Sequence, residues 1–123
     1  MIERNEAVTV SLVRLALDAA SLRHQAIATN IANAGNAEHR PLRVSFEEQL
    51  DAARRELNSR GRVGTGSLSG VTPRLIGDAA PGERPLDLET ANMAQNTMQY
   101  QALLKGLSKY MSIVSAAINE GKR

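Results

Sequence analysis

The stretch LETANMAQNTMQYQALLKGLSKYMSIVSAAIN, residues 88–119, decides the fold of this chain. Apolar residues recur in it at alternating steps of four and three, the heptad spacing of a helix that keeps one seam against a partner helix. The positions in this series are Met93, Thr97, Tyr100, Leu104, Leu107, Met111, Val114 and Ile118. A second series beside it consists of Leu103, Tyr110, Ile113 and Ala117. The stretch therefore predicts a long helix whose apolar surface is too wide for one partner to cover.

A second long helix is predicted at the front of the chain, over about residues 6–34, with Gly35 as its terminator. It also carries two apolar stripes, offset by about 100° around the helix axis. One stripe consists of Leu12, Leu15, Ala19, Leu22 and Ala26, and the other of Val13, Leu17, Ala20, Ile27 and Ile31. Two interpretations fit this pattern: a helix buried deep in a small bundle, or a helix that packs on the tail helix and on neighbouring copies of the chain.

The segment between the two long helices is predicted to hold little regular structure. Residues 35–57 indicate a polar turn and then a short helix, because Ser45 and Glu48 have the spacing of a capping box. Residues 58–85 hold six of the nine glycines and three of the four prolines, so we expect a loop with at most one short extended run, over 71–76. The tail helix is expected over about 87–120, with Asp87 as its cap. The chain is thus predicted to be one mainly all-α domain, 1–123, whose terminal helices pack as an antiparallel coiled-coil hairpin.

Composition limits the classes of function. The 15 basic and 13 acidic residues give a net charge of +2, which is too even to argue for nucleic-acid binding by charge alone. Cysteine is absent, which excludes disulfides, thiol catalysis and cysteine-bound zinc. Charged residues interrupt the first 17 positions, so we expect neither a cleaved secretory signal nor a membrane span there.

Candidate catalytic or metal-binding residues are few. His24 and His39 are the two histidines and lack the spacing of a metal-binding helix pair, so His24 is expected to lie partly buried in the helix seam. The acidic residues Glu47, Glu48 and Asp51 are more typical of a helix cap and an exposed face than of a paired acid and base. We therefore expect no enzymatic activity, no metal, no cofactor and no small-molecule substrate.

Polar residues beside the apolar stripes require another explanation. Asn30 and Asn33 lie in the last turn of the front helix, where their amides either bond to exposed backbone or to another helix, or simply cap the helix end. Gln101 follows Tyr100 on the tail helix. Such polar groups either fix the register between packed helices, as buried polar residues do in coiled coils, or lie on the surface.

Two motifs, one in each long helix, resemble the flagellar rod and hook family of axial proteins. Residues 29–34, TNIANA, are similar to the family's Ser-Asn-Ile-Ala-Asn-Ala signature, and residues 44–46, Val-Ser-Phe, follow it. Residues 96–103, NTMQYQAL, are similar to the family's Asn-x-Leu-x-Tyr-Gln-Ala pattern. Residues 36–39 are Asn-Ala-Glu-His, whereas the family commonly has Thr-Pro-Gly-Tyr there. The last residues are more similar to the proximal rod subtype than to other rod subunits.

The resemblance implies a structural subunit of the proximal rod in the bacterial flagellar basal body. Such a subunit would be exported by the flagellar type III apparatus without a cleaved Sec signal. Its terminal helices would form a coiled-coil layer in a tube that spans the periplasm, transmits torque and encloses the export channel. Its partners would be copies of itself, other rod subunits, the rod adaptor, and the export gate or membrane ring, with no nucleic acid.

A function of another class is also compatible with the sequence. This alternative is a cytoplasmic helical adaptor whose basic flexible loop touches nucleic acid or anionic lipid. Under the rod interpretation, the residues expected in packing or subunit interfaces are Leu15, Leu22, Ile27, Asn30, Ile31, Asn33, Met93, Asn96, Tyr100, Gln101, Leu104, Leu107, Met111, Val114 and Ile118.

Overall fold

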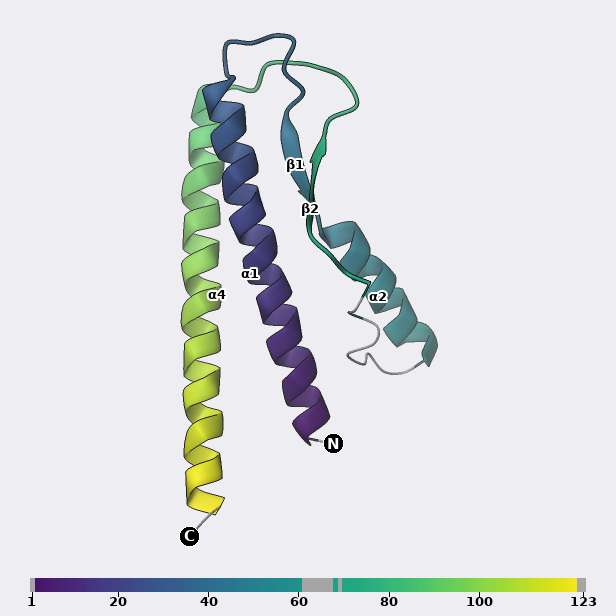
Figure 1. Ribbon diagram of the computed structural model, residues 1–123, viewed down its shortest axis with the longest axis vertical. Helices are drawn as coiled ribbons and strands as arrows, with labels where there is room; N and C mark the ends of the chain where they lie inside the picture. Colours follow the sequence, from purple (N-terminus) through teal and green to yellow (C-terminus); the bar gives the residue numbers. More distant parts are fainter. Residues whose placement is uncertain (1, 61–67, 69, 122–123) are drawn as a thin grey trace.

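The computed structural model describes residues 2–60, 68 and 70–121 (Figure 1). The regular elements are, in chain order, α1 (Ile2–Ala32), β1 (Leu42–Ser45), α2 (Glu47–Arg60), β2 (Arg74–Gly77) and α4 (Leu86–Gly121). Most of the expected glycine-rich loop between 58 and 70 lies outside the described residues, namely 61–67 and 69.

The two long helices, α1 and α4, pack side by side in opposite directions (Figure 1). The N-terminal end of α1 and the C-terminal end of α4 lie at the same end of this hairpin. The predicted fold class is confirmed, because the chain is mainly helical and its terminal helices pack on each other. At about 1.5 Å per residue, α4 with 36 residues is several ångströms longer than α1 with 31.

The helix bounds differ from the expected ones by a few residues. Helix α1 begins at Ile2 instead of about residue 6 and ends at Ala32 instead of 34. It ends early because the next backbone bonds tighten into turns: the Ala34 N–H donates to the Ile31 carbonyl at 3.2 Å and the Asn36 N–H to the Asn33 carbonyl at 3.0 Å. The Asn33 side-chain Nδ2 donates to the Thr29 carbonyl at 2.8 Å. Helix α4 begins at Leu86, so Asp87 is inside the first turn, where its Oδ1 accepts from the Leu88 N–H at 3.0 Å.

Helix α2 begins one residue later than the capping box predicts, because Ser45 is the last residue of β1. Glu48 still faces the helix start. Its own backbone N–H, the Arg43 guanidinium 3.1 Å away and the Phe46 N–H hold the pKa of the Glu48 carboxyl below its ordinary value of 4.5. The helix runs to Arg60, three residues beyond the expected end.

Strands β1 and β2 form a two-stranded antiparallel sheet, of which the sequence predicted only the second strand. The extended run expected over 71–76 corresponds to β2, in which Leu75 pairs with Val44 of β1. Strand β1 is four residues long between Pro41 and Phe46, which is too short for a period-two pattern to be visible. The sheet brings the segment after α1 and the segment before α4 together, as Figure 1 shows.

The hydrophobic core lies between α1 and this middle layer. It consists of Ala19, Val44, Phe46, Ala53, Leu68 and Val71, with Val8, Leu15, Ala16, Leu22 and Leu50 packed against it. Helix α1 is therefore covered on two sides within the subunit, by α4 and by the layer of β1, β2 and α2. This arrangement favours the first interpretation of its two apolar stripes, a helix buried in a small domain. Helix α4 has α1 as its packing neighbour among the described elements.

Candidate assembly interface

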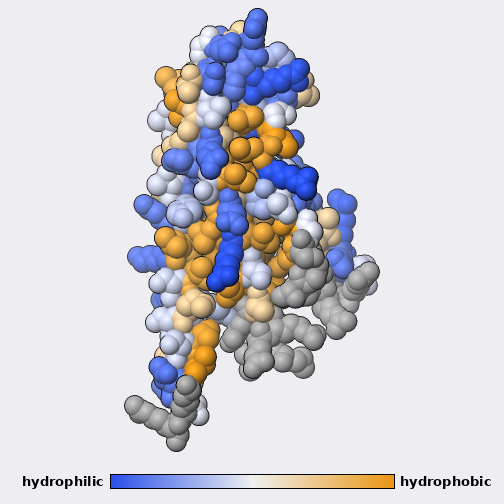
Figure 2. All heavy atoms as spheres, viewed as in Figure 1, coloured by the Kyte–Doolittle hydropathy of each residue, from blue (hydrophilic) through white to orange (hydrophobic). Residues whose placement is uncertain are grey.

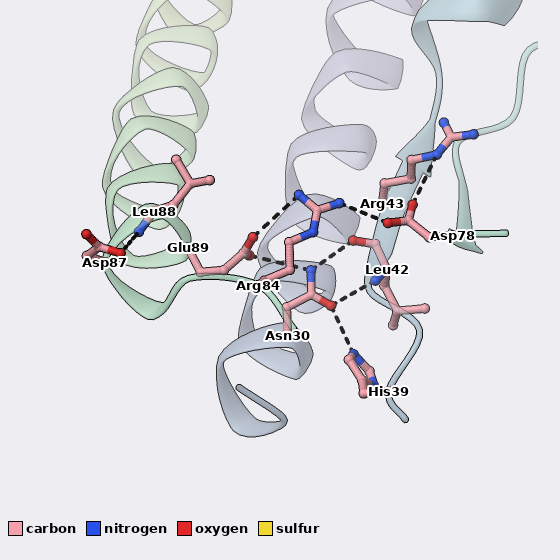
Figure 3. A network of polar contacts seen from close by, with 9 residues as sticks. All are labelled: Asn30, His39, Leu42, Arg43, Asp78, Arg84, Asp87, Leu88 and Glu89. Carbon is pink, nitrogen blue, oxygen red and sulfur yellow. Dashed lines mark hydrogen bonds and ion pairs between the residues drawn. The ribbon is translucent and has the colours of Figure 1, made fainter. Parts of the chain in front are cut away.

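Asn30 joins three elements at the closed end of the hairpin (Figure 3). Its side chain, 3% exposed, donates from Nδ2 to the Leu42 carbonyl at 3.0 Å, and its Oδ1 accepts from the Leu42 N–H at 2.8 Å. The amide of Asn30 thus pairs with the backbone of β1 as a neighbouring strand would. His39 Nε2 lies 3.2 Å from the same Oδ1, and Glu89 Oε2 lies 3.5 Å from Nδ2. We call Asn30, His39, Leu42, Arg84 and Glu89 the Asn30 junction.

Glu89 brings a buried carboxylate from the first turn of α4 into this junction. Its residue is 1% exposed, and Arg84 Nη1 lies 3.7 Å from Glu89 Oε1. Arg84 also forms an ion pair with Asp78 at 3.2 Å, and Arg43 of β1 lies 3.9 Å from the same carboxyl group (Figure 3). Because a buried charge without partners is costly, these contacts fix the position of α4 relative to β1 and the preceding loop.

Asn96 makes the second buried polar contact between the long helices. It is 3% exposed, and its Nδ2 donates to the Ala20 carbonyl of α1 at 2.8 Å. Its Oδ1 is buried and has no hydrogen-bond partner among the described residues. Asn30 and Asn96 line the same hollow of about 260 Å³, together with Arg23, which pairs with Glu47 at 2.6 Å. The segments 29–34 and 96–103, to which Asn30 and Asn96 belong, therefore meet in one place.

Below this polar region, each of the two apolar series of α4 has some members that face α1 and others that stay exposed. Leu103, Leu107, Tyr110 and Val114 are half-buried, and the first three line a hollow with Val13 of α1. The first series was expected to form the seam as a whole. Its residues instead occupy a wide sector of the α4 surface, so that only some of them face α1. Four of its members stay 38–55% exposed, and we call them the α4 stripe: Tyr100, Leu104, Met111 and Ile118. Figure 2 shows hydrophobic atoms exposed along the two long helices on one face of the molecule.

The residues predicted to lie in interfaces fall into three groups. Those inside the subunit, either buried or packed on the core, are Leu15, Leu22, Ile27, Asn30 and Asn96. Those that are half-buried are Ile31, Asn33, Met93, Leu107 and Val114. Those that are exposed are Tyr100, Gln101, Leu104, Met111 and Ile118. Among these residues, another molecule can contact the exposed group, and the half-buried group only through the exposed part of each side chain.

Three residues of the site differ from what the sequence indicated. His24, expected to be partly buried in the seam, is exposed at a hollow that Tyr100 and Leu104 also line, because it points to one side of the α1–α4 contact. Glu89 and His39 were not expected at an interface, but both contact Asn30. Asn30 lies 59 residues from Glu89 and 9 residues from His39 in the chain, beyond any local pattern.

Other kinds of site find little support in the described part of the chain. His, Asp and Glu side chains do not gather there in a group of three that could hold a metal ion. Within the same ranges, neither long helix combines the length and apolarity that a membrane-spanning segment requires. No protein-family model matches the chain, and a search of curated proteins finds no relative.

Proposed function

We propose that this chain is a structural subunit of the bacterial flagellar rod, of the proximal type, that assembles through its terminal helices. The observation that carries the proposal is the α4 stripe, whose members Leu104, Met111 and Ile118 recur every seven residues and stay about half exposed. A heptad stripe is the pattern by which helices pack on other helices. A stripe left uncovered on a folded subunit is typical of an interaction surface.

The positions of the two motifs support this proposal. Their buried amides, Asn30 and Asn96, hold α1 and α4 in one relative position, through the Glu89 carboxyl group and the Ala20 carbonyl. A hairpin fixed in this way presents the α4 stripe as a rigid, preorganised surface, which lowers the entropic cost of association. Lateral contacts between many such hairpins would build the wall of a tube that transmits torque and encloses the export channel.

The experiment compares two aspartate substitutions on α4 in the flagellated bacterium that encodes the chain. Leu104→Asp places a charge in the α4 stripe, where a neighbouring subunit would bury it without a partner. Ser112→Asp introduces the same charge at an exposed position outside the stripe. Both isolated variants should stay within about 1 kcal/mol of the parent in free energy of unfolding, because Leu104 is already about half exposed and Ser112 is exposed.

We expect a tagged parent chain and the Ser112→Asp variant to localise to basal bodies and to support motility. The Leu104→Asp variant should be produced and exported but absent from purified rods. Normal incorporation of Leu104→Asp would refute the assembly surface. A parent chain that remains diffuse in the cytoplasm would refute the rod assignment and favour the adaptor alternative.

A further inference from the structure

The outer edge of β2 carries backbone groups without partners. The Asp78 N–H donates to the Pro41 carbonyl at 2.9 Å, which fixes the phase of the hydrogen bonds between β1 and β2. Since the backbone groups of successive residues point to opposite edges of a strand, Ile76 faces β1, whereas Leu75 and Gly77 direct their N–H and C=O groups away from it. None of these four groups bonds to another described residue.

The outer edge of β1, in contrast, is closed by α1. Leu42 also directs its backbone groups away from the partner strand, and the Asn30 amide binds both of them, at 2.8 and 3.0 Å (Figure 3). Asn30 thus occupies one side of the sheet as a third strand would, and the side beyond β2 stays open. Leu75 is 39% exposed at this open edge. An unpaired strand edge is a template for an extended segment of another chain.

The sequence of the open edge is complementary to itself. When two copies of RLIGD, Arg74 to Asp78, run antiparallel with Ile76 opposite Ile76, Arg74 lies opposite Asp78 of the other copy. In the same register Leu75 lies opposite Gly77, which has no side chain to obstruct it. The outward-facing Leu75 and Gly77 then form the hydrogen-bonded pairs, and the two Ile76 residues form the non-hydrogen-bonded pair between them. Opposite charges and apolar side chains directly across from each other stabilise antiparallel strands.

The charges around Asp78 favour this register. Ion pairs at 3.1–3.9 Å link three carboxylates with two guanidinium groups in the described part of the chain, and these residues are Glu48, Asp78, Glu89, Arg43 and Arg84. The Asp78 side chain is 33% exposed, so a further cation can reach it. Arg74 is exposed and has no ion-pair partner among the described residues. The Arg74 guanidinium of a second copy would therefore balance the third carboxylate.

We propose that two copies of this chain pair through the outer edges of β2, antiparallel and two-fold symmetric about Ile76. The two small sheets then form one continuous four-stranded sheet. Backbone hydrogen bonds between Leu75 and Gly77 and ion pairs between Arg74 and Asp78 hold the copies together. Because the same patch meets itself, the contact closes at two copies. It uses neither α1 nor α4, so it does not depend on the proposed rod function and concerns the free subunit.

Single cysteine substitutions test the register, because the parent chain has no cysteine. A non-hydrogen-bonded pair places its Cα atoms about 4.5 Å apart, within the range of a disulfide. Ile76→Cys can therefore form a disulfide across the two-fold axis. Two Leu75→Cys residues would lie diagonally, about 7–8 Å apart, which is beyond that range. Leu75 is the more exposed of the two residues, so random oxidation would favour Leu75→Cys instead.

The purified full-length variants are oxidised in a glutathione buffer, and each rate is divided by the rate at which the same thiol reacts with a small aromatic disulfide. This division corrects for the exposure and pKa of each thiol. Disulfide-linked dimers should form at least about tenfold faster from Ile76→Cys than from Leu75→Cys. Equal rates, or a faster Leu75→Cys reaction, would overturn the proposal.

The ion pairs are tested in the Ile76→Cys chain. Arg74→Asp places like charges opposite each other at two positions of the contact, and should slow dimer formation about tenfold after the same correction. Arg74→Lys is the matched control, because it keeps the charge and should keep the rate. Equal rates for the two variants would overturn the proposal.

Amide hydrogen exchange tests the contact in the parent chain. The Ile76 N–H bonds to β1 and should be protected at every protein concentration. The Leu75 and Gly77 N–H groups should become protected only as the concentration rises. Exchange of these two amides that does not change with concentration would overturn the proposal. Dimers that instead gain protection along α4 would overturn it in favour of pairing through the long helices.

Discussion

Asn30→Asp tests the contact at which α1, β1 and α4 meet. The substitution keeps the shape of the side chain and the acceptor that binds the Leu42 N–H, and it replaces the Nδ2 donor by oxygen. That oxygen would lie about 3.0 Å from the Leu42 carbonyl and about 3.5 Å from the buried Glu89 carboxylate, the distances that Nδ2 has now. Two attractive contacts become repulsive ones.

The expected cost follows from these contacts. The lost hydrogen bond to Leu42 is worth about 1 kcal/mol, and a buried carbonyl left without its donor costs about 1–3 kcal/mol more. A second carboxylate beside Glu89 adds the cost of an unpaired buried charge. We expect the free energy of unfolding to fall by at least about 3 kcal/mol at pH 7, a large share of the stability of an ordinary domain.

The assay is urea unfolding followed by far-UV circular dichroism, in which this loss lowers the midpoint by about 1–3 M. The matched control is Asn36→Asp, because Asn36 is exposed and uses Oδ1, which aspartate retains, to accept from the Glu38 N–H at 3.0 Å. The control should change stability by less than about 0.5 kcal/mol. Equal stability of the two variants would refute the role of Asn30.

The pH dependence gives an independent check. Burial beside Glu89 raises the pKa of the introduced carboxyl in the folded chain above its unfolded value. Folding of the variant therefore binds a proton, and its stability increases as the pH falls through the raised pKa. The difference between parent and Asn30→Asp should be largest near pH 7 and narrow toward pH 4. Glu89→Gln in the same variant should restore part of the stability, since an amide can donate to the new carboxylate.

Three further substitutions are predicted. Asn96→Leu should change the free energy of unfolding by less than about 1 kcal/mol. It removes a stabilising hydrogen bond to the Ala20 carbonyl, but it also removes the destabilising buried Oδ1 that has no partner among the described residues. A loss of stability as large as that of Asn30→Asp would contradict this. Glu48→Gln should lower the melting temperature slightly at pH 7. The difference should shrink as the pH falls below about 4.5 and disappear below the lowered pKa of the folded chain, because a carboxyl with a lowered pKa stabilises fully only above its unfolded value; melting curves recorded from pH 7 down to pH 3 measure this. Gly106→Ala should stabilise the isolated chain by about 1 kcal/mol, which thermal unfolding measures, and a destabilised variant would show that the fold itself needs glycine there.

Periodicity was sufficient to predict the two long helices, their antiparallel pairing and the presence of two apolar series on each. It did not show which residues of the two α4 series face α1, because the series overlap on neighbouring positions and both have heptad spacing. Leu103 of the second series and Leu107 of the first both line the hollow with Val13 of α1. Ile113 of the second series and Leu104 of the first both stay exposed. The choice depends on how α1 is oriented by the middle layer, which no local pattern encodes.

The middle layer itself was the least predictable part. Its strand β1 has four residues, and the partner strand comes after a long segment rich in glycine, so neither strand has a strong signal. The Asn30 junction was predictable only as polar side chains near a helix end. Its partners were not, because Leu42 and Glu89 are brought to Asn30 by the sheet and by the start of α4.

The buried amides also influence the order in which the chain can fold. Asn30 and Leu42 are 12 residues apart, whereas Asn30 is 59 residues from Glu89 and Asn96 is 76 residues from Ala20. The first contact needs only a short loop, but the other two require the chain to close on itself over 59 and 76 of its 123 residues, which is slow. A polypeptide that emerges from a narrow passage N-terminus first would therefore acquire its middle layer early. It would complete the hairpin only when its final third had emerged.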